Sequence, residues 1–375
     1  MPDYHEEGKI ALPCPTPTPF GNPSSRHTEG RAAKDALEAA RSRCAKVLGV
    51  PFESLYFTSG GTEANCIALY SNLFRPGQGR ILCSRAEHPS IVENVETLGR
   101  LGKPTGVIPV DSCGRVTAEL LASTLAKYGD VRFAAIMAVN NEAGAINDIP
   151  SIKNVLKTYD GPPVHLHCDM VQAAGKIPLD LAACDSASIS AHKLGGPRGI
   201  GLLYLRQPLE VLYAGGGQER KQRPGTENTA GALALADCLE KHAHRETVQA
   251  EYKLAASRMK RLATALASME RCIIIPAQRI KDIEYNGGNF SPYILQVAFR
   301  GIPGEVMVRA LDDCGFAVST GSACGSFSPE RPVLEAMGID SDTRLWGIRI
   351  SQGWSTSDDE IELLIEAVKE ILKTL

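Results

Sequence analysis

Short apolar runs alternate with segments of helical spacing along the first half of the chain, and this alternation constrains the fold more than any other feature. The runs are four to eight residues long and lie at residues 54–57, 80–84, 107–110, 133–140, 164–169, 186–190 and 200–205. Strands that alternate with helices form a largely parallel sheet that helices cover on both faces. The sequence therefore predicts an α/β fold built on a mainly parallel seven-stranded sheet, with ligands at the carboxyl ends of its strands.

The segments that precede this alternation are of two kinds. Residues 11–23 are too rich in proline for a helix or a central strand, so we expect an extended leader over residues 1–23. Residues 30–50 carry apolar side chains at helical spacing as far as Gly49, which predicts an amphipathic helix. We expect a large domain over residues 24–245.

The last third of the chain has a different pattern. The elements that we expect there are two long helices and two short strands, at residues 251–269, 272–275, 293–299 and 357–372. Ser357 and Glu360 have the spacing of a capping box at the start of the closing helix. This pattern predicts a second, smaller α+β domain over residues 246–375.

Composition disfavours several classes of partner. The 375 residues carry a formal net charge of -3 and have a pI near 6.3, which gives no basic surface for nucleic acid or an anionic membrane. The 11 cysteines are odd in number and irregular in spacing, which favours reduced thiols over a disulfide framework. Because the sequence also shows no long apolar run and no signal-peptide pattern, we expect a cytoplasmic protein without a membrane partner.

The stretch TSGGTEAN, residues 58–65, follows a predicted strand and opens a predicted helix. Glycines and hydroxyls before a helix N-terminus present backbone N–H groups and the positive end of the helix dipole, which suits a phosphate. A plain strand-to-helix turn with Thr62 as the N-cap explains the same residues equally well. Because the loop matches neither the Walker motif nor GxGxxG, this stretch alone leaves both interpretations open.

The stretch HCDMVQAAGK, residues 167–176, places Asp169 at the end of an apolar strand, with Gln172 three residues later. A carboxylate in that position can pair with a cationic ring nitrogen, although a helix N-cap is the more ordinary role. The neighbouring residues that suggest a metal site are His165, His167 and Cys168. Side chains alternate along a strand, so these groups cannot converge on one ion, and we expect no metal.

The stretch SISAHKLGGPRGIG, residues 188–201, puts Lys193 between a strand and a glycine-rich turn. A lone lysine in a loop is usually solvated, but Ser190 and His192 crowd polar groups around this one. A phosphate-binding loop, a carboxylate after a strand and a lysine some two dozen residues later are together the parts that hold pyridoxal phosphate. The lysine then forms the Schiff base, and the acid keeps the ring nitrogen protonated.

In their order along the chain, these motifs resemble those of the cysteine desulfurases of the NifS/IscS type, which are class V aminotransferase-like proteins. The resemblance is carried by FGNPSSRH at 20, TSGGTEAN at 58, AEHPS at 86, VNNEAG at 139, HCDMVQAAGK at 167, SISAHKLGGPRGIG at 188, GGGQERKQRPGTEN at 215, STGSACGS at 319 and IRIS at 348. It implies the type I fold of transferases that depend on pyridoxal 5'-phosphate, with that compound as the cofactor.

The resemblance assigns residues to the cofactor's ring. It implies that Lys193 forms the Schiff base, that Asp169 pairs with the pyridine nitrogen, and that Gln172 and Asn141 lie near the phenolic oxygen. His88, in AEHPS, matches the histidine that stacks on the ring and handles protons. Without the motif it would be interpreted as a surface histidine before a Pro-Ser turn.

Further positions match the family's phosphate site. The residues of one subunit that match it are Gly61, Thr62, Ser190 and His192. Thr226, in RPGTEN, resembles the threonine that reaches the phosphate of the neighbouring subunit. The resemblance therefore implies an obligate homodimer.

The resemblance also assigns the substrate and the sulfur carrier. Arg349 matches the arginine that pairs with the substrate carboxylate, where an ordinary ion pair is the alternative, and Asn22 belongs to the same substrate-binding set. The thiolate of Cys324 is expected to attack the sulfur of L-cysteine, which leaves a persulfide on the enzyme and releases L-alanine. The persulfide then passes to an acceptor protein, such as a scaffold for iron–sulfur clusters or a thiolation system.

One departure from the family pattern keeps other functions open. The family begins with a strand and turn resembling YLDNNATT, whereas IALPCPTPTP precedes FGNPSS here. We expect either a truncated or alternative form, or a leader that replaces the segment by other means. The rival functions are a selenocysteine lyase, another class V enzyme, or a non-catalytic scaffold with the same fold. The loop after Ser319 is close to the longer type of IscS-like members, which lets a persulfide reach several acceptors.

Overall fold

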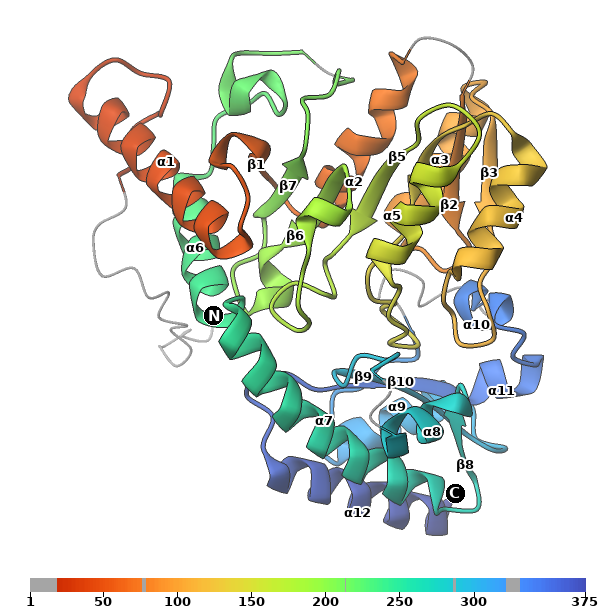
Figure 1. Cartoon of the computed structure of the whole chain (residues 1–375). Helices are drawn as coiled ribbons and strands as arrows, with labels where there is room; N and C mark the ends of the chain where they lie inside the picture. The colour runs from red at the N-terminus through yellow and green to blue at the C-terminus, as the bar shows by residue number, and fades with distance from the viewer. Residues whose placement is uncertain (1–18, 76–78, 213, 286–287, 322–330) are drawn as a thin grey trace, which may run out of the picture.

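The structure is a computed structural model, and it describes residues 19–75, 79–212, 214–285, 288–321 and 331–375. Figure 1 shows a large part built on one wide sheet and a smaller part below it that contains the C-terminus. Most of the expected leader, and Cys324, lie outside the described residues.

The large part contains one sheet of seven strands in the order β1-β7-β6-β5-β4-β2-β3. The strands are β1 (Leu55–Thr58), β2 (Arg80–Ser84), β3 (Thr105–Ile108), β4 (Val131–Ala135), β5 (His165–Asp169), β6 (Ser186–Ser190) and β7 (Gly201–Leu205). Strand β7 is antiparallel to both of its neighbours, and the other pairs are parallel. The prediction of a mainly parallel seven-stranded sheet is confirmed.

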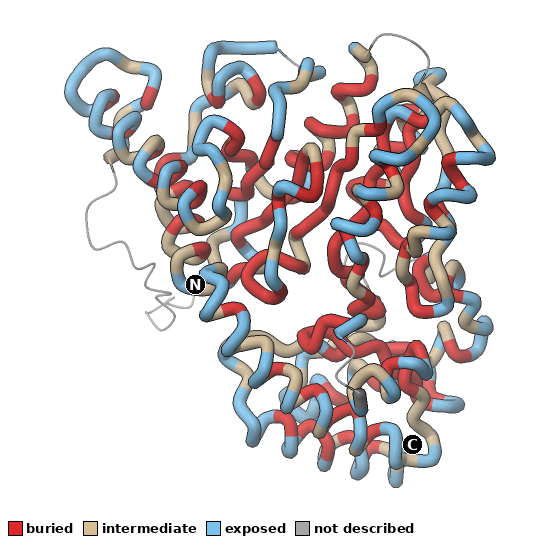
Figure 2. Tube along the Cα trace, viewed as in Figure 1, coloured by how far each residue is buried: buried red, intermediate tan, exposed pale blue. Residues whose placement is uncertain are grey.

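Side chains that alternate along the strands divide the core between two layers of helices. On β2, Ile81 and Cys83 pack in the cluster of α2 and α3, whereas Leu82 packs in the larger cluster on the other face. The first layer contains α2 (Gly61–Tyr70) and α3 (Pro89–Arg100), and the second contains α1 (Thr28–Leu48), α4 (Ala118–Tyr128), α5 (Ile149–Thr158) and α6 (Thr229–His242). Figure 2 shows that the strands between these layers are largely buried.

The small part is built on an antiparallel sheet of three strands in the order β10-β9-β8. The strands are β8 (Cys272–Ile275), β9 (Ile294–Phe299) and β10 (Gly347–Ser351). The helices of this part are α7 (Arg245–Ala267), α8 (Gln278–Tyr285), α9 (Gly304–Asp313), α10 (Pro332–Ala336), α11 (Ser341–Trp346) and α12 (Asp358–Thr374). None of the helices in the described ranges combines the length and apolar character needed to cross a bilayer.

Helix α7 connects the two cores. Its residue Ala255 packs in the cluster of the large sheet, and Met259 and Leu262 pack in the cluster of the small one. The domain boundary that we expect between residues 245 and 246 falls in the first turn of this helix. The division into residues 24–245 and 246–375 stays a prediction.

Element boundaries differ from the predictions in a few places. The helix expected at residues 30–50 is α1, which begins and ends two residues earlier. Helix α7 begins at Arg245 rather than at residue 251, because a polar first turn hides the start of its apolar pattern. Strand β4 ends at Ala135, and the residues after it lead into the VNNEAG turn. The capping box of Ser357 and Glu360 is confirmed.

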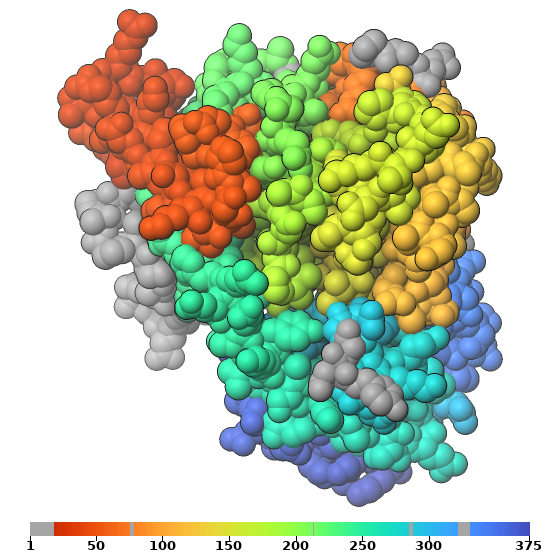
Figure 3. Space-filling view, viewed as in Figure 1, coloured from red at the N-terminus to blue at the C-terminus, as the bar shows by residue number. Residues whose placement is uncertain are grey.

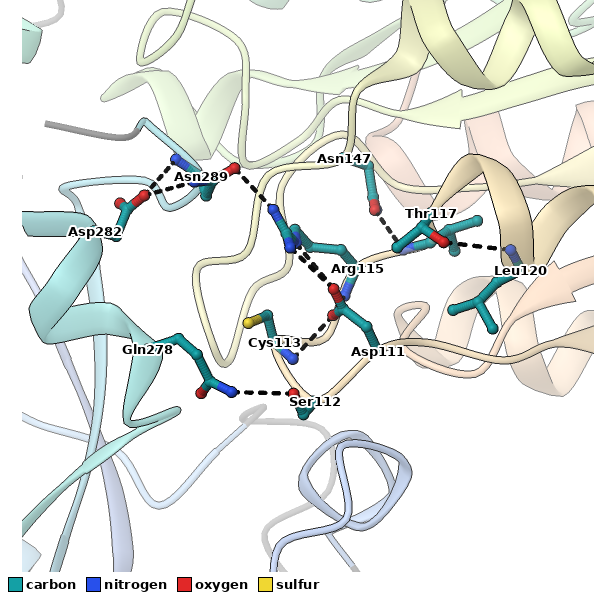
Figure 4. A network of polar contacts seen from close by, with 11 residues as sticks. Asp111, Ser112, Cys113, Arg115, Thr117, Leu120, Asn147, Gln278, Asp282 and Asn289 are labelled. Carbon is teal, nitrogen blue, oxygen red and sulfur yellow. Dashed lines mark hydrogen bonds and ion pairs between the residues drawn. The ribbon is translucent and has the colours of Figure 1, made fainter. Parts of the chain in front are cut away.

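A polar network joins the loop after β3 to the small part (Figure 4). Arg115 donates from Nη1 to Oδ1 of Asn289 at 2.7 Å, and Asn289 donates from Nδ2 to Oδ1 of Asp282, in α8, at 2.8 Å. Gln278 donates to the hydroxyl of Ser112 at 3.1 Å. In Figure 1 the arrow of β5 points toward the small part, and Figure 3 shows the two parts in contact. The carboxyl edge of the large sheet therefore faces the small sheet.

Candidate active site

The turn between β1 and α2 presents backbone rather than side chains. Gly60 is the N-cap of α2, and no side chain of the described residues caps this helix, so the interpretation of Thr62 as the N-cap is wrong. A Cβ atom at Gly61 would lie 2.6 Å from Cγ2 of Val171 and 3.7 Å from Cβ of Ser190, so the turn is packed closely against the ends of β5 and β6. The exposed Thr62 lies in the first turn. This end of the helix is suited to an anion.

Asp169 ends β5 and is buried. Its Oδ2 accepts a hydrogen bond from Nδ2 of Asn65 at 2.9 Å, and its Oδ1 accepts one from the backbone N–H of Val171 at 3.0 Å. The residues after β5 form turns rather than a helix, so Asp169 is not a helix N-cap. Gln172, in these turns, accepts a hydrogen bond from Nζ of Lys176 at 3.0 Å.

Lys193 lies in the short 3-10 turn Ala191–Leu194, directly after β6, and is half-buried. Strands β5 and β6 are parallel neighbours, so the turn that carries Lys193 and the carboxylate of Asp169 come from the same edge of the sheet. Ser190 ends β6, is buried, and has its Oγ 2.8 Å from Nδ1 of His192. The structure therefore brings three predicted phosphate positions, Gly61, Ser190 and His192, to one edge.

His88 is the N-cap of α3, and its Nδ1 accepts a hydrogen bond from the backbone N–H of Ser90 at 3.1 Å. The Ser90 hydroxyl in turn accepts a hydrogen bond from Nδ2 of Asn65 at 2.9 Å. Burial lowers the pKa of His88, while the charge of Asp169 raises it and that of Lys193 lowers it. His88 is thus a half-buried residue beside the other candidates rather than an isolated surface histidine.

Lys176 is a charged residue near the site that the sequence analysis did not single out. Burial, with the positive charges of Lys193 and Arg349, lowers the pKa of Lys176 to about 7. Lys176 is the last residue of the stretch HCDMVQAAGK, but nothing in the spacing of that stretch indicates that its side chain is buried. The site therefore contains a second lysine amine besides that of Lys193, and burial favours its neutral form.

Arg349 reaches the site from the small sheet. It lies in the middle of β10 and donates from Nη1 to the backbone carbonyl of Asn141 at 2.9 Å. Burial lowers the pKa of Arg349, and the nearby carboxylate of Glu142 raises it. The backbone of Arg349 also pairs with Ser319, the first residue of STGSACGS. The start of the cysteine-bearing loop is therefore fixed beside the predicted substrate arginine.

Three predicted site residues are not brought to this edge within the described part of one chain. Thr226 is exposed. Asn22 is exposed, its Oδ1 accepts a hydrogen bond from the backbone N–H of Ser24 at 2.9 Å, and Figure 1 shows its segment before α1 far from β10. Cys324 lies outside the described residues. The roles of these residues stay predictions.

The row of polar residues on β5 is engaged in hydrogen bonds. Within the described residues no group of three or more His, Cys, Asp and Glu side chains is arranged to hold a metal ion. Alternation along the strand separates only Cys168 from the others, since His165, His167 and Asp169 share one face, where their partners are hydroxyl and amide groups.

Comparison with known proteins places the chain in a family. Residues 19–364 match the aminotransferase class-V family. The chain is 35% identical over 366 residues to the cysteine desulfurase IscS of Dictyoglomus turgidum, covering 95% of this chain and 88% of that relative. The chain belongs to the cysteine desulfurases of the NifS/IscS type, within the class-V aminotransferases.

Two solved structures support this family. A structure named NifS-like protein is 32% identical, with a TM-score of 0.85, and the match covers 95% of this chain and 93% of that one. A structure titled "SspA in complex with cysteine" is 26% identical, with a TM-score of 0.74, and the match covers 88% of this chain and 90% of that one. The predicted resemblance and the predicted fold class are confirmed.

Proposed function

We propose that this member of the NifS/IscS family is a cysteine desulfurase that uses pyridoxal 5'-phosphate to convert L-cysteine to L-alanine. The observation that carries the proposal is the meeting of Asp169, Lys193 and the uncapped end of α2 at one sheet edge. Arg349 faces that edge from the small sheet. This arrangement provides an acid, an amine, an anion site and a carboxylate-binding guanidinium in one place.

The residues present fit pyridoxal phosphate. The phosphate would lie at the end of α2, where Gly60 provides no capping side chain and Gly61 leaves no room for one. Asp169 would accept from the ring nitrogen, and Asn65 and Val171 already orient its two oxygens. Lys193 would attach the cofactor through its amine. Backbone N–H groups would therefore bind the phosphate, and Asp169 would be a fixed acceptor for the ring nitrogen.

When bound, the cofactor supplies an electron sink for the bond broken at the substrate Cα. The amine of Lys193 takes up the Cα proton, and His88 moves protons close to the same ring. The guanidinium of Arg349 binds the substrate carboxylate, and its planar shape allows a bidentate contact with both carboxylate oxygens. The thiolate of Cys324 attacks the substrate sulfur and keeps it as a persulfide, while the three-carbon remainder leaves as L-alanine.

The proposal includes partners. The persulfide on Cys324 passes to a sulfur-acceptor protein, such as an iron–sulfur scaffold or a thiolation system. Thr226, exposed in a single chain, completes the phosphate site of the neighbouring subunit in a homodimer. We also place this activity in the cytoplasm, which the cysteine composition supports because thiols stay reduced there.

Removal of Cys324 tests the proposal. The protein is incubated with L-cysteine and a thiol reductant, and sulfide and alanine are measured. Cys324→Ala should lose both products while it keeps the visible band of bound pyridoxal phosphate, because the thiol acts after the cofactor is bound. Cys314→Ala, which removes an exposed cysteine elsewhere in the small part, is the control and should keep full activity.

Two other results of these measurements would support the rival functions. Unchanged sulfide release by Cys324→Ala would contradict the desulfurase mechanism and favour a selenocysteine lyase or another class V enzyme. A wild-type protein that binds no pyridoxal phosphate would favour a non-catalytic scaffold. In that second case Lys193→Ala would have no effect on the absorption spectrum.

A further inference from the structure

A continuous row of hydrogen bonds runs from Asp169 through the sheet to its opposite edge. His167 Nε2 lies 2.9 Å from Oδ1 of Asn65, and His167 Nδ1 lies 2.8 Å from Oγ of Ser186. The same hydroxyl lies 2.7 Å from Nε2 of His165. Asn65 then connects the row to Asp169. Because β5 rises about 3.3 Å per residue, the row spans roughly 13 Å from His165 to Asp169.

The chemistry of the end group fixes the direction of every bond in this row. The carboxylate of Asp169 accepts, so the amide nitrogen of Asn65 faces it and the amide oxygen faces His167. His167 must therefore donate from Nε2. Its Nδ1 is then free to accept only if the ring is neutral, and burial lowers the pKa of His167 to about 3.

The same reasoning continues to the far end. With His167 Nδ1 as an acceptor, the Ser186 hydroxyl donates to it and accepts from Nε2 of His165. Burial, assisted by the positive charge of Arg75, lowers the pKa of His165 to about 3, so this ring is neutral as well. All donors in the row thus point toward Asp169, and hydrogen bonds aligned in this way polarise one another.

Packing holds both rings in register with the row. The ring of Phe133, on the neighbouring strand β4, stacks on His165 with centroids 5.1 Å apart and lies 6.2 Å from that of His167. His167 and Ser186 are fully buried. His165 is only partly buried, and it lines a cleft of about 370 Å³ with Arg75, Asp185 and Arg206.

We propose that His167, Ser186 and His165 are positioning residues that orient Asp169 for the ring nitrogen of the cofactor through this one-directional row of hydrogen bonds. The inference rests on the proposed function for the role of Asp169, but not for the existence of the row. It extends the site by three residues that touch neither substrate nor cofactor.

Histidine NMR tests the row without any cofactor. In ¹⁵N-labelled protein, both His165 and His167 should appear as neutral Nε2–H tautomers near neutral pH. Ser186→Ala should shift both rings, because it removes the hydroxyl that they share. Ser188→Ala is the matched control, since Ser188 is a buried serine on the same strand whose hydroxyl has no partner among the described residues. A charged ring, or an Nδ1–H tautomer of His167, would overturn the assignment.

Cofactor titration tests the effect on Asp169. His167→Leu should weaken binding of pyridoxal phosphate by about tenfold or more and shift its visible band, because Asn65 loses the donor that fixes its amide. His167→Gln should restore most of the affinity, since its amide can donate to Asn65. Ser186→Ala should shift the band in the same direction, and Ser188→Ala should not.

The two proposals fail in different ways. If the wild-type protein binds pyridoxal phosphate and His167→Leu binds it with unchanged affinity and spectrum, the positioning role is wrong and the proposed function stands. If the wild-type protein binds none while the tautomers agree, the proposed function is wrong and the row remains as a structural feature. If His167→Leu fails to fold and Ser186→Ala folds, the cofactor titration of Ser186→Ala decides whether the positioning role is correct.

Discussion

Glu87 is a buried acid that lies next to His88 in the AEHPS motif. Its Oε1 accepts hydrogen bonds from the hydroxyl of Ser84 and from the backbone N–H of Met137, the latter at 2.9 Å. Its Oε2 has no partner among the described residues. Burial, partly offset by those hydrogen bonds, raises the pKa of Glu87 to about 8. The side chain is therefore a neutral acid at neutral pH, which adds no second negative charge close to Asp169.

The raised pKa of Glu87 predicts how the free energy of unfolding depends on pH. A carboxyl whose pKa is higher in the folded than in the unfolded chain stabilises the fold at low pH and loses that contribution as pH rises. Here the window runs from 4.5, the ordinary value, to about 8. Glu87→Gln should therefore gain stability relative to the wild type across that window, as measured by urea unfolding. The control is Glu96→Gln, which removes an exposed carboxyl of α3. A stability difference between Glu87→Gln and the wild type that does not change with pH would contradict a buried neutral acid.

At the scale of elements, a buried ion pair anchors the segment that leads to Thr226. Arg41 of α1 binds Glu219 through two hydrogen bonds of 2.7 and 2.8 Å, and Glu219 also accepts from the backbone N–H of Phe57 at 2.8 Å. Glu219, Arg220 and Lys221 all have positive φ angles, between 44° and 66°, which non-glycine residues adopt only when their surroundings require it. The ion pair therefore maintains a strained turn.

Breaking this pair should cost much more than breaking the half-exposed ion pairs of Arg43 on the same helix. Removing one partner of a buried pair typically costs about 3–5 kcal/mol, so Arg41→Met should lower the free energy of unfolding by roughly that amount. The control is Arg43→Met, which breaks ion pairs of 2.5 Å to the half-exposed Asp237 and Glu240 and should cost about 1 kcal/mol or less. Equal costs in urea unfolding would show that burial of the Arg41 pair is unimportant.

The elements that the sequence predicted well are those with sharp local signals. Strands β2 and β6 match their predicted ranges because turn residues bound both apolar runs. The approach of Asp169 and Lys193 was also predictable, since both follow strands of one parallel sheet. Asn65 and Lys176 could not be identified in this way. Their burial depends on how α2 and the turns after β5 pack against the sheet, and no local periodicity records that packing.

At the scale of the whole molecule, the proposed homodimer rests on the position of Thr226. The phosphate end of the site is formed by α2 and the end of β6, whereas Thr226 is exposed at the end of the segment that Arg41 and Glu219 anchor. The exposed hydroxyl of Thr226, five residues after this anchored turn, is available for contact with a second copy of the chain. A homodimer in which each subunit gives Thr226 to the other would complete both sites, as C2 symmetry requires.

Mixed dimers test this sharing. A chain with Lys193→Ala and a chain with Thr226→Ala should each form dimers of low activity, because every site lacks one of the two residues. A mixed dimer of the two contains one intact site, so random co-expression should restore about a quarter of the wild-type sulfide production. The control pairs a Thr226→Ala chain with a chain that carries both changes, where no intact site can form. Absence of restoration in the mixed dimer would show that each chain completes its own site, and full activity of Thr226→Ala alone would show that Thr226 is not needed.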